Sequence, residues 1–406
     1  MKKEVVAYWL FALGIFLLVL KSMGAYFLWN VSIGPLSLLV TLIGLVYAKT
    51  QKQLYNSRHF IYAFLFLILY SIWDRDIMSQ INIGNIMPCI PILLVLMMPT
   101  KDKRTLLSFC SCGLAFISGI SLIAFILLFF TELPNVGIIS DETAENYSYT
   151  NYIILLKGAF YDIRFNAIFR EPGHLAMIAS YFLFANRYDM KKWYNIVLLI
   201  VIGFTLSLAG YVLTIVGYMF NLLLAGRLTT VFKKLIPYVI VMVIAMLGIM
   251  SYNRGHNFVN ELIIARLEYD EDKGVQGNNR VNDYTDTYFK NIISDGSFII
   301  GTGRDKQSHL ASIGKVTGSG YKIHIIARGL IGTFFIFMFY YVLAKNAPYR
   351  RFAFLMLLLY CLSFWQRAYP SWPAWIIPFI TSIYIYRPQA MLRQQKHNTI
   401  ERECLV

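Results

Sequence analysis

Long apolar runs alternate with short polar segments from one end of the chain to the other. Many of these runs reach the roughly 20 residues that an α-helix needs to cross a bilayer. A bilayer offers no water to backbone N–H and C=O groups, so such spans must be helical. The pattern therefore predicts an all-α polytopic membrane protein with about twelve transmembrane helices. The expected spans lie near residues 5–21, 26–48, 59–74, 79–98, 105–130, 170–187, 194–209, 211–226, 235–251, 323–344, 351–366 and 371–386.

Two segments between spans are much longer than the others, at residues 131–168 and 252–321. Loops of this length are usually functional or disordered. The second segment has helical apolar spacing at 258–267 and at 283–293, and the glycines of 301–303 mark a tight turn. We therefore expect one transmembrane domain over residues 1–406. Its two enlarged outer loops should contain short helices, and the second should form a small cap.

The composition supports a membrane protein, because 57% of the residues are hydrophobic and only 15% are charged. The net charge of +15 comes largely from basic residues grouped between spans on one side, as at Lys2, Lys3 and residues 101–104. Short cytoplasmic loops carry such an excess, so both termini are expected in the cytoplasm. The charge is thus explained by membrane orientation, and no nucleic-acid-binding motif accompanies it.

The sequence predicts no metal site and no cofactor. The five cysteines lie in expected spans or in the C-terminal tail, which indicates no disulfide framework. The chain has no P-loop, HExxH or GxSxG motif. It also lacks a series of carboxylates at mid-membrane depth, which a proton-driven transporter typically carries.

The stretch 164–174 places Arg164, Arg170, Glu171 and His174 at the start of an expected span. On a helix, residues 170 and 174 would share a face. Arginine forks and helix N-termini both bind phosphate oxygens, so the stretch predicts a site for an anionic ligand. The alternative interpretation is a snorkelling Arg170 beside a Glu171 that only caps the helix.

A second informative stretch, 318–332, leads into the expected span 323–344 and combines several glycines with His324 and Arg328. These two residues are four apart and share a helical face. At least half of the charges on a loop of this kind are expected at a solvated surface. The second outer loop supplies further basic side chains, interleaved with tyrosines. They are Arg266, Arg280, Arg304, Lys306, Lys315, Lys322, Tyr269, Tyr284, Tyr288 and Tyr321. Within this set Arg280 precedes an amphipathic helix, and Lys322 stands at the start of the span.

Charged and aromatic residues also mark the outer ends of two other spans. Asp74 ends the span 59–74, and Arg367 follows the span 351–366 beside Trp365, Tyr369 and Trp372. The aromatic residues are consistent with an interfacial belt or with a platform on which sugars stack. The sequence leaves both interpretations open.

Together these motifs resemble the Wzy-type polymerases of O-antigen, capsular and exopolysaccharide synthesis, which belong to a wider group with the O-antigen ligases. The resemblance covers nearly the whole chain and rests on four short motifs in order. They are Arg164 with 169–172, the 207–211 hairpin, Arg280 followed by 298–303, and 319–321 running into 329–332. The ligases carry a His-Asn pair near the position of Gly318, and that histidine is missing here, which favours a polymerase.

The resemblance implies a GT-C-like, ligase-like bundle in the bacterial inner membrane, and a metal-independent glycosyltransferase. The enzyme would transfer a growing glycan from undecaprenyl diphosphate to the non-reducing end of an incoming lipid-linked repeat unit. Arg170 and Arg280 would hold the diphosphates with support from Arg164 and Arg304. Glu171 is the first candidate for the general base, with His324 and His174 as rivals. The further expected substrate contacts are Tyr321, Lys322 and Arg328.

Other functions stay open at this point. A lipid-linked oligosaccharide flippase or polysaccharide transporter would also need a basic, lipid-accessible cavity, but one lined by cations along many spans. An O-antigen ligase would instead require a lipid or protein acceptor. The sugar, the linkage, the oligomeric state and the binding of a chain-length regulator are not determined by the sequence.

Overall fold

The computed structural model describes residues 3–51, 54, 57–81, 83–141, 147–158, 163–226, 251, 269–270, 274–275, 282–316, 318 and 320–387. The elements before residue 130 are α1 (Lys3–Ser22), η1 (Tyr26–Leu28), α2 (Ile33–Thr50), α3 (Arg58–Ile72), α4 (Ile77–Gln80), α5 (Ile83–Ile86), α6 (Cys89–Met97) and α7 (Thr100–Leu127). Next come β1 (Gly137–Asp141), β2 (Tyr147–Asn151), β3 (Leu156–Gly158), α8 (Pro172–Ala185), α9 (Trp193–Phe204), α10 (Leu208–Ala225), β4 (Tyr269–Asp270) and β5 (Gly274–Val275). The last are α12 (Asp283–Ser294), α13 (Arg304–Ser312), α14 (Tyr321–Lys345), α15 (Arg350–Gln366) and α16 (Pro373–Ile385).

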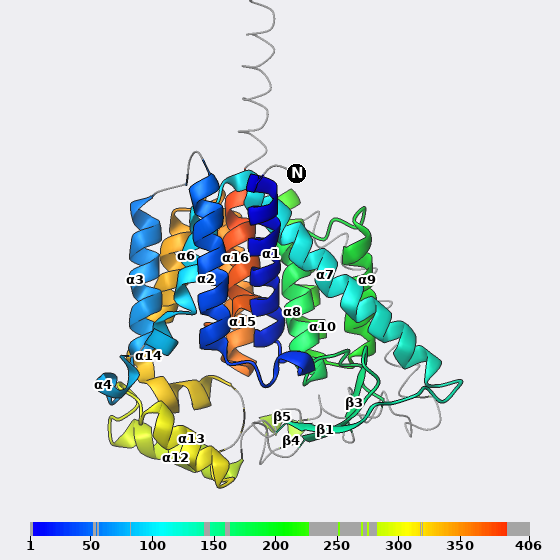
Figure 1. The fold of residues 1–406 in the computed structure, drawn as a ribbon. Coiled ribbons are helices and arrows are strands. Elements are labelled where there is room, and N and C mark those ends of the chain that lie inside the picture. The colour runs from blue at the N-terminus through cyan, green and yellow to red at the C-terminus, as the bar shows by residue number, and fades with distance from the viewer. Residues whose placement is uncertain are drawn as a thin grey trace, which may run out of the picture.

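The long helices run side by side as one bundle (Figure 1). The start of α1 lies at one end, and the strands together with α12 and α13 lie at the opposite end, which we call the cap end. Within the described residues, α1, α2, α7, α10 and α14 are long and apolar enough to cross a membrane. The chain is therefore mostly helical and has the helices of a membrane protein.

The bundle is organised around two short central helices. Every residue of α8 and of α16 is buried, although these helices have only 14 and 13 residues. At 1.5 Å per residue they extend about 20 Å, less than the roughly 30 Å of a hydrocarbon core. They can be short because other helices surround them, as α8 packs on α10, α9 and α16. Gly210 allows the closest of these contacts, since a Cβ there would lie 2.4 Å from the Ala176 Cβ.

Two expectations about the helices need comment. The expected span 79–98 is wrong as a single helix, because the chain there forms three short helices, α4, α5 and α6. Pro88 stands just before α6 and Pro91 lies in its first turn. Proline has no N–H and clashes with the preceding turn, which explains the break between α5 and α6. The break between α4 and α5 lies before both prolines. The expected span 235–251 and the expected helix 258–267 lie almost entirely outside the described residues.

The first outer loop contains strands where short helices were expected, so the all-α prediction is wrong in this segment. Strands β1, β2 and β3 form an antiparallel sheet in that order, with Tyr149 of β2 opposite Ile139 and Gly158. The alternation of aromatic, β-branched and polar residues in β2 suits a half-buried strand. Tyr149 also donates from its hydroxyl to the Arg170 carbonyl at 2.8 Å. The sheet thereby fixes the backbone that leads into α8.

The second outer loop contains the predicted cap helix, since α12 occupies almost the expected range 283–293. Asn282 caps it by accepting a hydrogen bond from the Thr285 backbone N–H at 2.9 Å. A small apolar cluster of Ile292, Val316 and Ile326 joins α12 to α14. This cluster attaches the cap to the bundle.

Helix α14 is kinked at Gly329, and the glycine turn 301–303 packs against the helix at this kink. Gly329 has φ 65° and ψ −174°, which interrupts the helical hydrogen bonds. The carbonyls before it accept new donors, with Ile326 bonded to the Thr302 N–H at 2.7 Å and Ala327 to the Gly303 N–H at 3.2 Å. Gly301 makes this approach possible, because a Cβ there would lie 2.6 Å from the Gly329 nitrogen.

Replacing Gly329 with Ala should destabilise the protein by roughly 3 kcal/mol, because the new Cβ combines a left-handed backbone with a clash. That Cβ would lie 2.3 Å from the carbonyl carbon of Ile300. Gly314→Ala is the matched control, since Gly314 has a similar φ of 68° and no neighbour within 4 Å. Thermal unfolding in detergent measures both variants. Equal losses of stability would contradict the packing role assigned to the kink.

Candidate functional site

A cavity of about 220 Å³ opens at the cap end between α3, α13, α14 and the segment 367–372. We call it the cap cavity. Its wall combines cationic, imidazole and aromatic side chains, which is an unusual lining at the end of an apolar bundle. The lining residues used below are Tyr70, Arg304, His324, Arg328, Tyr369 and Trp372.

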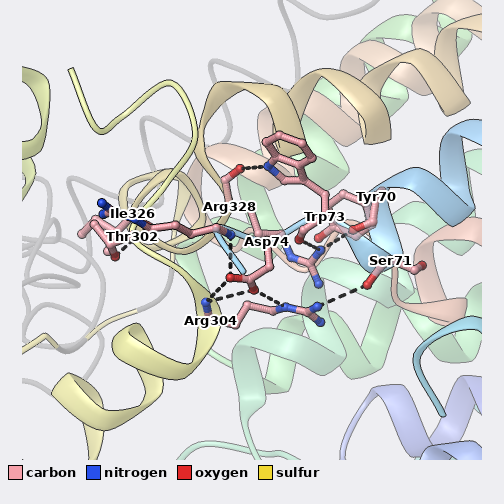
Figure 2. Close-up of polar contacts among 9 residues, drawn as sticks. Tyr70, Ser71, Trp73, Asp74, Thr302, Arg304, Ile326 and Arg328 are labelled. Carbon is pink, nitrogen blue, oxygen red and sulfur yellow. Dashed lines mark hydrogen bonds and ion pairs between the residues drawn. The ribbon is translucent and has the colours of Figure 1, made fainter. Parts of the chain in front are cut away.

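The Arg304 side of the cavity is fixed by a buried carboxylate (Figure 2). Asp74 is only 4% exposed, and its Oδ2 accepts from the Arg304 Nε at 2.9 Å and from the Arg304 backbone N–H at 3.1 Å. Gly303 is required beside it, because a Cβ there would lie 2.9 Å from Asp74 Oδ1. Asp74 therefore holds the first turn of α13 against the end of α3 and balances the charge of Arg304.

Arg328 is held differently, by an aromatic ring and by backbone carbonyls. Its guanidinium carbon lies 4.2 Å from the centre of the Tyr70 ring, a cation–π contact. Its Nη1 donates to the carbonyls of Tyr70 and Trp73, and the indole N–H of Trp73 donates to the Arg328 carbonyl at 2.9 Å (Figure 2). In the part of the chain that the structure describes, these hydrogen bonds leave from Nη1 alone. Arg328 also lines the cap cavity, and its Nε and Nη2 make no hydrogen bond among the described residues.

His324 lies one turn before Arg328 and completes this side of the cavity. The ring is parallel to Tyr70, with centroids 5.9 Å apart, and Phe364 meets it edge-on at 5.1 Å. His324 is only 6% exposed, and its Nε2 has no hydrogen-bond partner among the described residues. In the neutral tautomer with a proton on Nδ1, Nε2 carries the free lone pair.

A second polar group centres on Arg367, at the end of α15. Arg367 is 6% exposed and forms an ion pair through Nη2 with the Glu171 carboxylate. Its Nη1 donates to His174 Nε2 at 2.5 Å. Arginine has only donors, so His174 must accept this bond as a neutral ring. Gly173 leaves room for the guanidinium, because a Cβ there would lie 3.0 Å from Nη2.

These contacts change the interpretation of the stretch 164–174. Glu171 stands at the N-cap of α8 as expected, but its side chain makes no capping hydrogen bond and pairs with Arg367. Arg170 lies before the helix and not on the face of His174, because α8 begins at Pro172. Its guanidinium lies 5.9 Å from the centre of the Trp29 ring. Arg164 donates instead to the Thr205 carbonyl at 3.2 Å, beside the α9–α10 connection.

The Arg367 group and the cap cavity meet at one pair of aromatic rings. Tyr369 and Trp372 stack with centroids 4.0 Å apart and planes 4° from parallel. His174 contacts both rings edge-on, at 5.5 Å from Tyr369 and 5.1 Å from Trp372. The same two rings line the cap cavity. His174 therefore contacts the two rings that line the cap cavity together with His324.

The other predicted site residues lie away from this wall or outside the description. Lys322 forms an ion pair with Asp286 of α12 at 2.6 Å. This contact gives Lys322 a structural role, because it attaches the cap helix to α14. Tyr321 stacks on Trp365 with centroids 4.4 Å apart. Arg280 lies outside the described residues. Its assignment stays a prediction.

A wider, more open hollow lies near Arg170. It has a volume of about 590 Å³ and is lined by residues at the starts of α2 and α5, including Lys21, Trp29 and Asn85. Lys21 donates from Nζ to the carbonyls of Leu28 and Trp29, at 2.8 and 3.0 Å. Arg170 packs on Trp29, which lines this hollow. The next residue, Glu171, forms the ion pair with Arg367.

Sequence reasoning noted Asp74 and Arg367 but assigned them no role, and it missed Tyr70. The available signal was position, because a charged residue at the end of an apolar span needs a partner. The partners of Asp74 and Arg367 come from distant segments, so no local sequence pattern identifies them. Among the described residues, no three His, Cys, Asp or Glu side chains are grouped to hold a metal ion. No family model, curated protein or solved structure matches the chain.

Proposed function

We propose that the protein is a polysaccharide polymerase at the outer face of the bacterial cytoplasmic membrane. It transfers a growing glycan from undecaprenyl diphosphate to the non-reducing end of an incoming undecaprenyl-diphosphate-linked repeat unit. The observation that carries this proposal is the cap cavity, where Arg304, Arg328 and His324 meet at the end of an apolar bundle. A cationic cavity in this position suits a ligand that has an anionic head and a lipid tail.

The orientation follows from the same arrangement. The start of α1 lies at the end of the bundle opposite the cap (Figure 1). The basic loops of the sequence favour a cytoplasmic N-terminus, which would place the cap end at the outer face. The substrate lipids would then remain in the outer leaflet while their head groups enter the cap cavity.

The leaving group is the first requirement of the proposed reaction. Negative charge develops on the diphosphate as the bond to the sugar breaks, and preorganised guanidinium groups stabilise such charge. Arg328 lines the cap cavity and forms no ion pair among the described residues, while Arg304 is paired with Asp74. We therefore assign the main contact to Arg328. Arg170 and Arg280 stay candidates for the second lipid diphosphate.

The proton acceptor is the second requirement, and the three candidates differ in their partners. Glu171 is ion-paired with Arg367, and His174 already accepts a hydrogen bond from the same guanidinium. His324 lines the cavity with Nε2 unpartnered among the described residues. We therefore prefer His324 to Glu171 as the base. A general base must reach the proton that it abstracts.

The proposed step conserves atoms and charge. The acceptor hydroxyl oxygen bonds to the anomeric carbon of the donor glycan as the bond from that carbon to the diphosphate oxygen breaks. The electron pair of the broken bond leaves with undecaprenyl diphosphate, beside Arg328. The hydroxyl proton moves to His324 Nε2, which later returns it to solvent.

Purified protein in detergent should convert lipid-linked repeat units, extracted from source cells, into a ladder of longer glycans. Arg328→Ala should slow this by roughly 100-fold, because the leaving group loses a preorganised donor. Arg75→Ala is the matched control, since Arg75 is exposed at the end of α3 beside the cavity and should retain activity. Arg328→Lys should keep the charge and fold but recover only part of the rate.

Absence of any ladder from folded wild-type protein would contradict the polymerase. Transport of the same lipids across liposome membranes, without chain growth, would then favour the flippase. Transfer to a lipid or protein acceptor, without growth of the repeat, would favour the ligase.

A further inference from the structure

The stacked pair of Tyr369 and Trp372 is held in place by its own backbone and by the bundle. The Tyr369 N–H donates to the Arg367 carbonyl at 3.0 Å, and the Trp372 N–H donates to the Tyr369 carbonyl at 3.2 Å. Between them, the Pro370 carbonyl accepts from the buried Tyr340 hydroxyl at 2.9 Å. These bonds define a compact turn, so the two rings form a preorganised wall.

An interfacial belt does not account for this wall. Belt aromatics place their rings among lipid headgroups, as Trp365 can, with 65% of its surface exposed. Tyr369 and Trp372 are only partly exposed and line a cavity that also contains arginine and imidazole groups. Buried polar groups support them from behind, because His174 touches both rings and is itself bonded to Arg367.

We propose that the Tyr369–Trp372 wall is the subsite for the terminal sugar of the acceptor glycan. This inference rests on the proposed function and extends it to substrate recognition. The C–H face of a pyranose ring is apolar and slightly positive, so it complements the negative face of an aromatic ring. A sugar stacked on this wall would occupy the same cavity as His324 Nε2, the proposed acceptor of its hydroxyl proton.

The size of the cavity limits what the subsite can hold. Its volume of about 220 Å³ is below the ~300–1,000 Å³ typical of pockets for drug-sized ligands. The subsite would therefore hold one sugar ring beside the diphosphate, with the rest of the glycan outside. Because the two rings stack face to face, a sugar can stack only on an outer face of the pair. An aromatic face favours a sugar ring whose hydroxyls are mostly equatorial, because such a ring presents an uninterrupted C–H face.

Two probes that differ only in the glycan test this inference. One is undecaprenyl diphosphate without sugar, and the other is the undecaprenyl-diphosphate-linked repeat unit extracted from source cells. Trp372→Ala should weaken binding of the repeat unit by about tenfold and leave binding of undecaprenyl diphosphate unchanged. Trp372→Phe should keep most of the affinity. Trp365→Ala is the matched control outside the cavity and should bind both probes like the wild type.

Equal weakening of both probes by Trp372→Ala would show a structural role and overturn the subsite, as would unchanged binding of both. If Trp372→Ala does not fold, Tyr369→Leu decides the question by the same comparison. Wild-type protein that binds neither probe would refute the proposed function, and the subsite with it. Wild-type protein that binds both probes but forms no ladder would refute the polymerase alone, and the variants would still decide the subsite.

Discussion

His324→Gln is expected to lower the rate of glycan transfer by about 10²–10⁴-fold, the range for removal of a positioned general base. The side chain lines the cap cavity and packs against Tyr70 and Phe364, and its Nε2 has no hydrogen-bond partner among the described residues. Glutamine keeps a similar volume and a polar end but cannot accept a proton at neutral pH. The measurement is the initial rate of ladder formation with purified protein at saturating substrate.

The pH profile separates a base from a structural histidine. With His324 as the base, the wild-type rate should fall as acid protonates the base, and His324→Gln should lose this acid limb from its residual rate. His309→Gln is the matched control, since His309 is exposed on α13 and should change neither the rate nor the profile. If Glu171→Gln removes the acid limb while His324→Gln retains it, the base is Glu171.

Arg367→Ala is expected to destabilise the protein by roughly 3 kcal/mol and to abolish polymer formation. The change removes the partner of Glu171 and the hydrogen-bond donor to His174 in one step. Removal of one member of a partly buried ion pair is costly because the other charge loses its partner. Thermal unfolding in detergent measures the loss of stability. Arg350→Ala is the matched control, since Arg350 is exposed at the opposite end of the same helix, α15.

A double-mutant cycle tests the mechanism behind this loss. Glu171→Gln in the Arg367→Ala background should recover part of the stability, because it removes the uncompensated carboxylate. Strictly additive losses would contradict the ion pair as the stabilising contact. Recovery of stability without recovery of activity would show that Arg367 also positions the site, as its contact with His174 indicates.

The helices of this protein follow largely from local sequence. Apolar length and helical spacing place α1, α3, α8 and α14 within a few residues of their expected ranges, because a helix satisfies its own backbone. The pairing of His324 with Arg328 on one face also follows from their spacing of four residues. Helix α12 was predictable because its cap and its apolar face are both local.

Other features depended on information that hydropathy does not carry. The expected span 79–98 is divided between α5 and α6 at Pro88, which cannot donate a backbone hydrogen bond to the preceding turn. The sheet of β1, β2 and β3 needs strands paired across the loop, and no local periodicity specifies such partners.

The sequence by itself determined that this is a helical membrane protein with two long loops and charged residues at the ends of its spans. Only the tertiary structure decided which of those charges meet. Glu171 and Arg367 lie 196 residues apart, and Asp74 and Arg304 lie 230 residues apart. A charge at the end of a span must find a partner because burial without one is costly, but that requirement does not name the partner. The packing of α8 between its neighbours and the kink at Gly329 determine which charged residues meet.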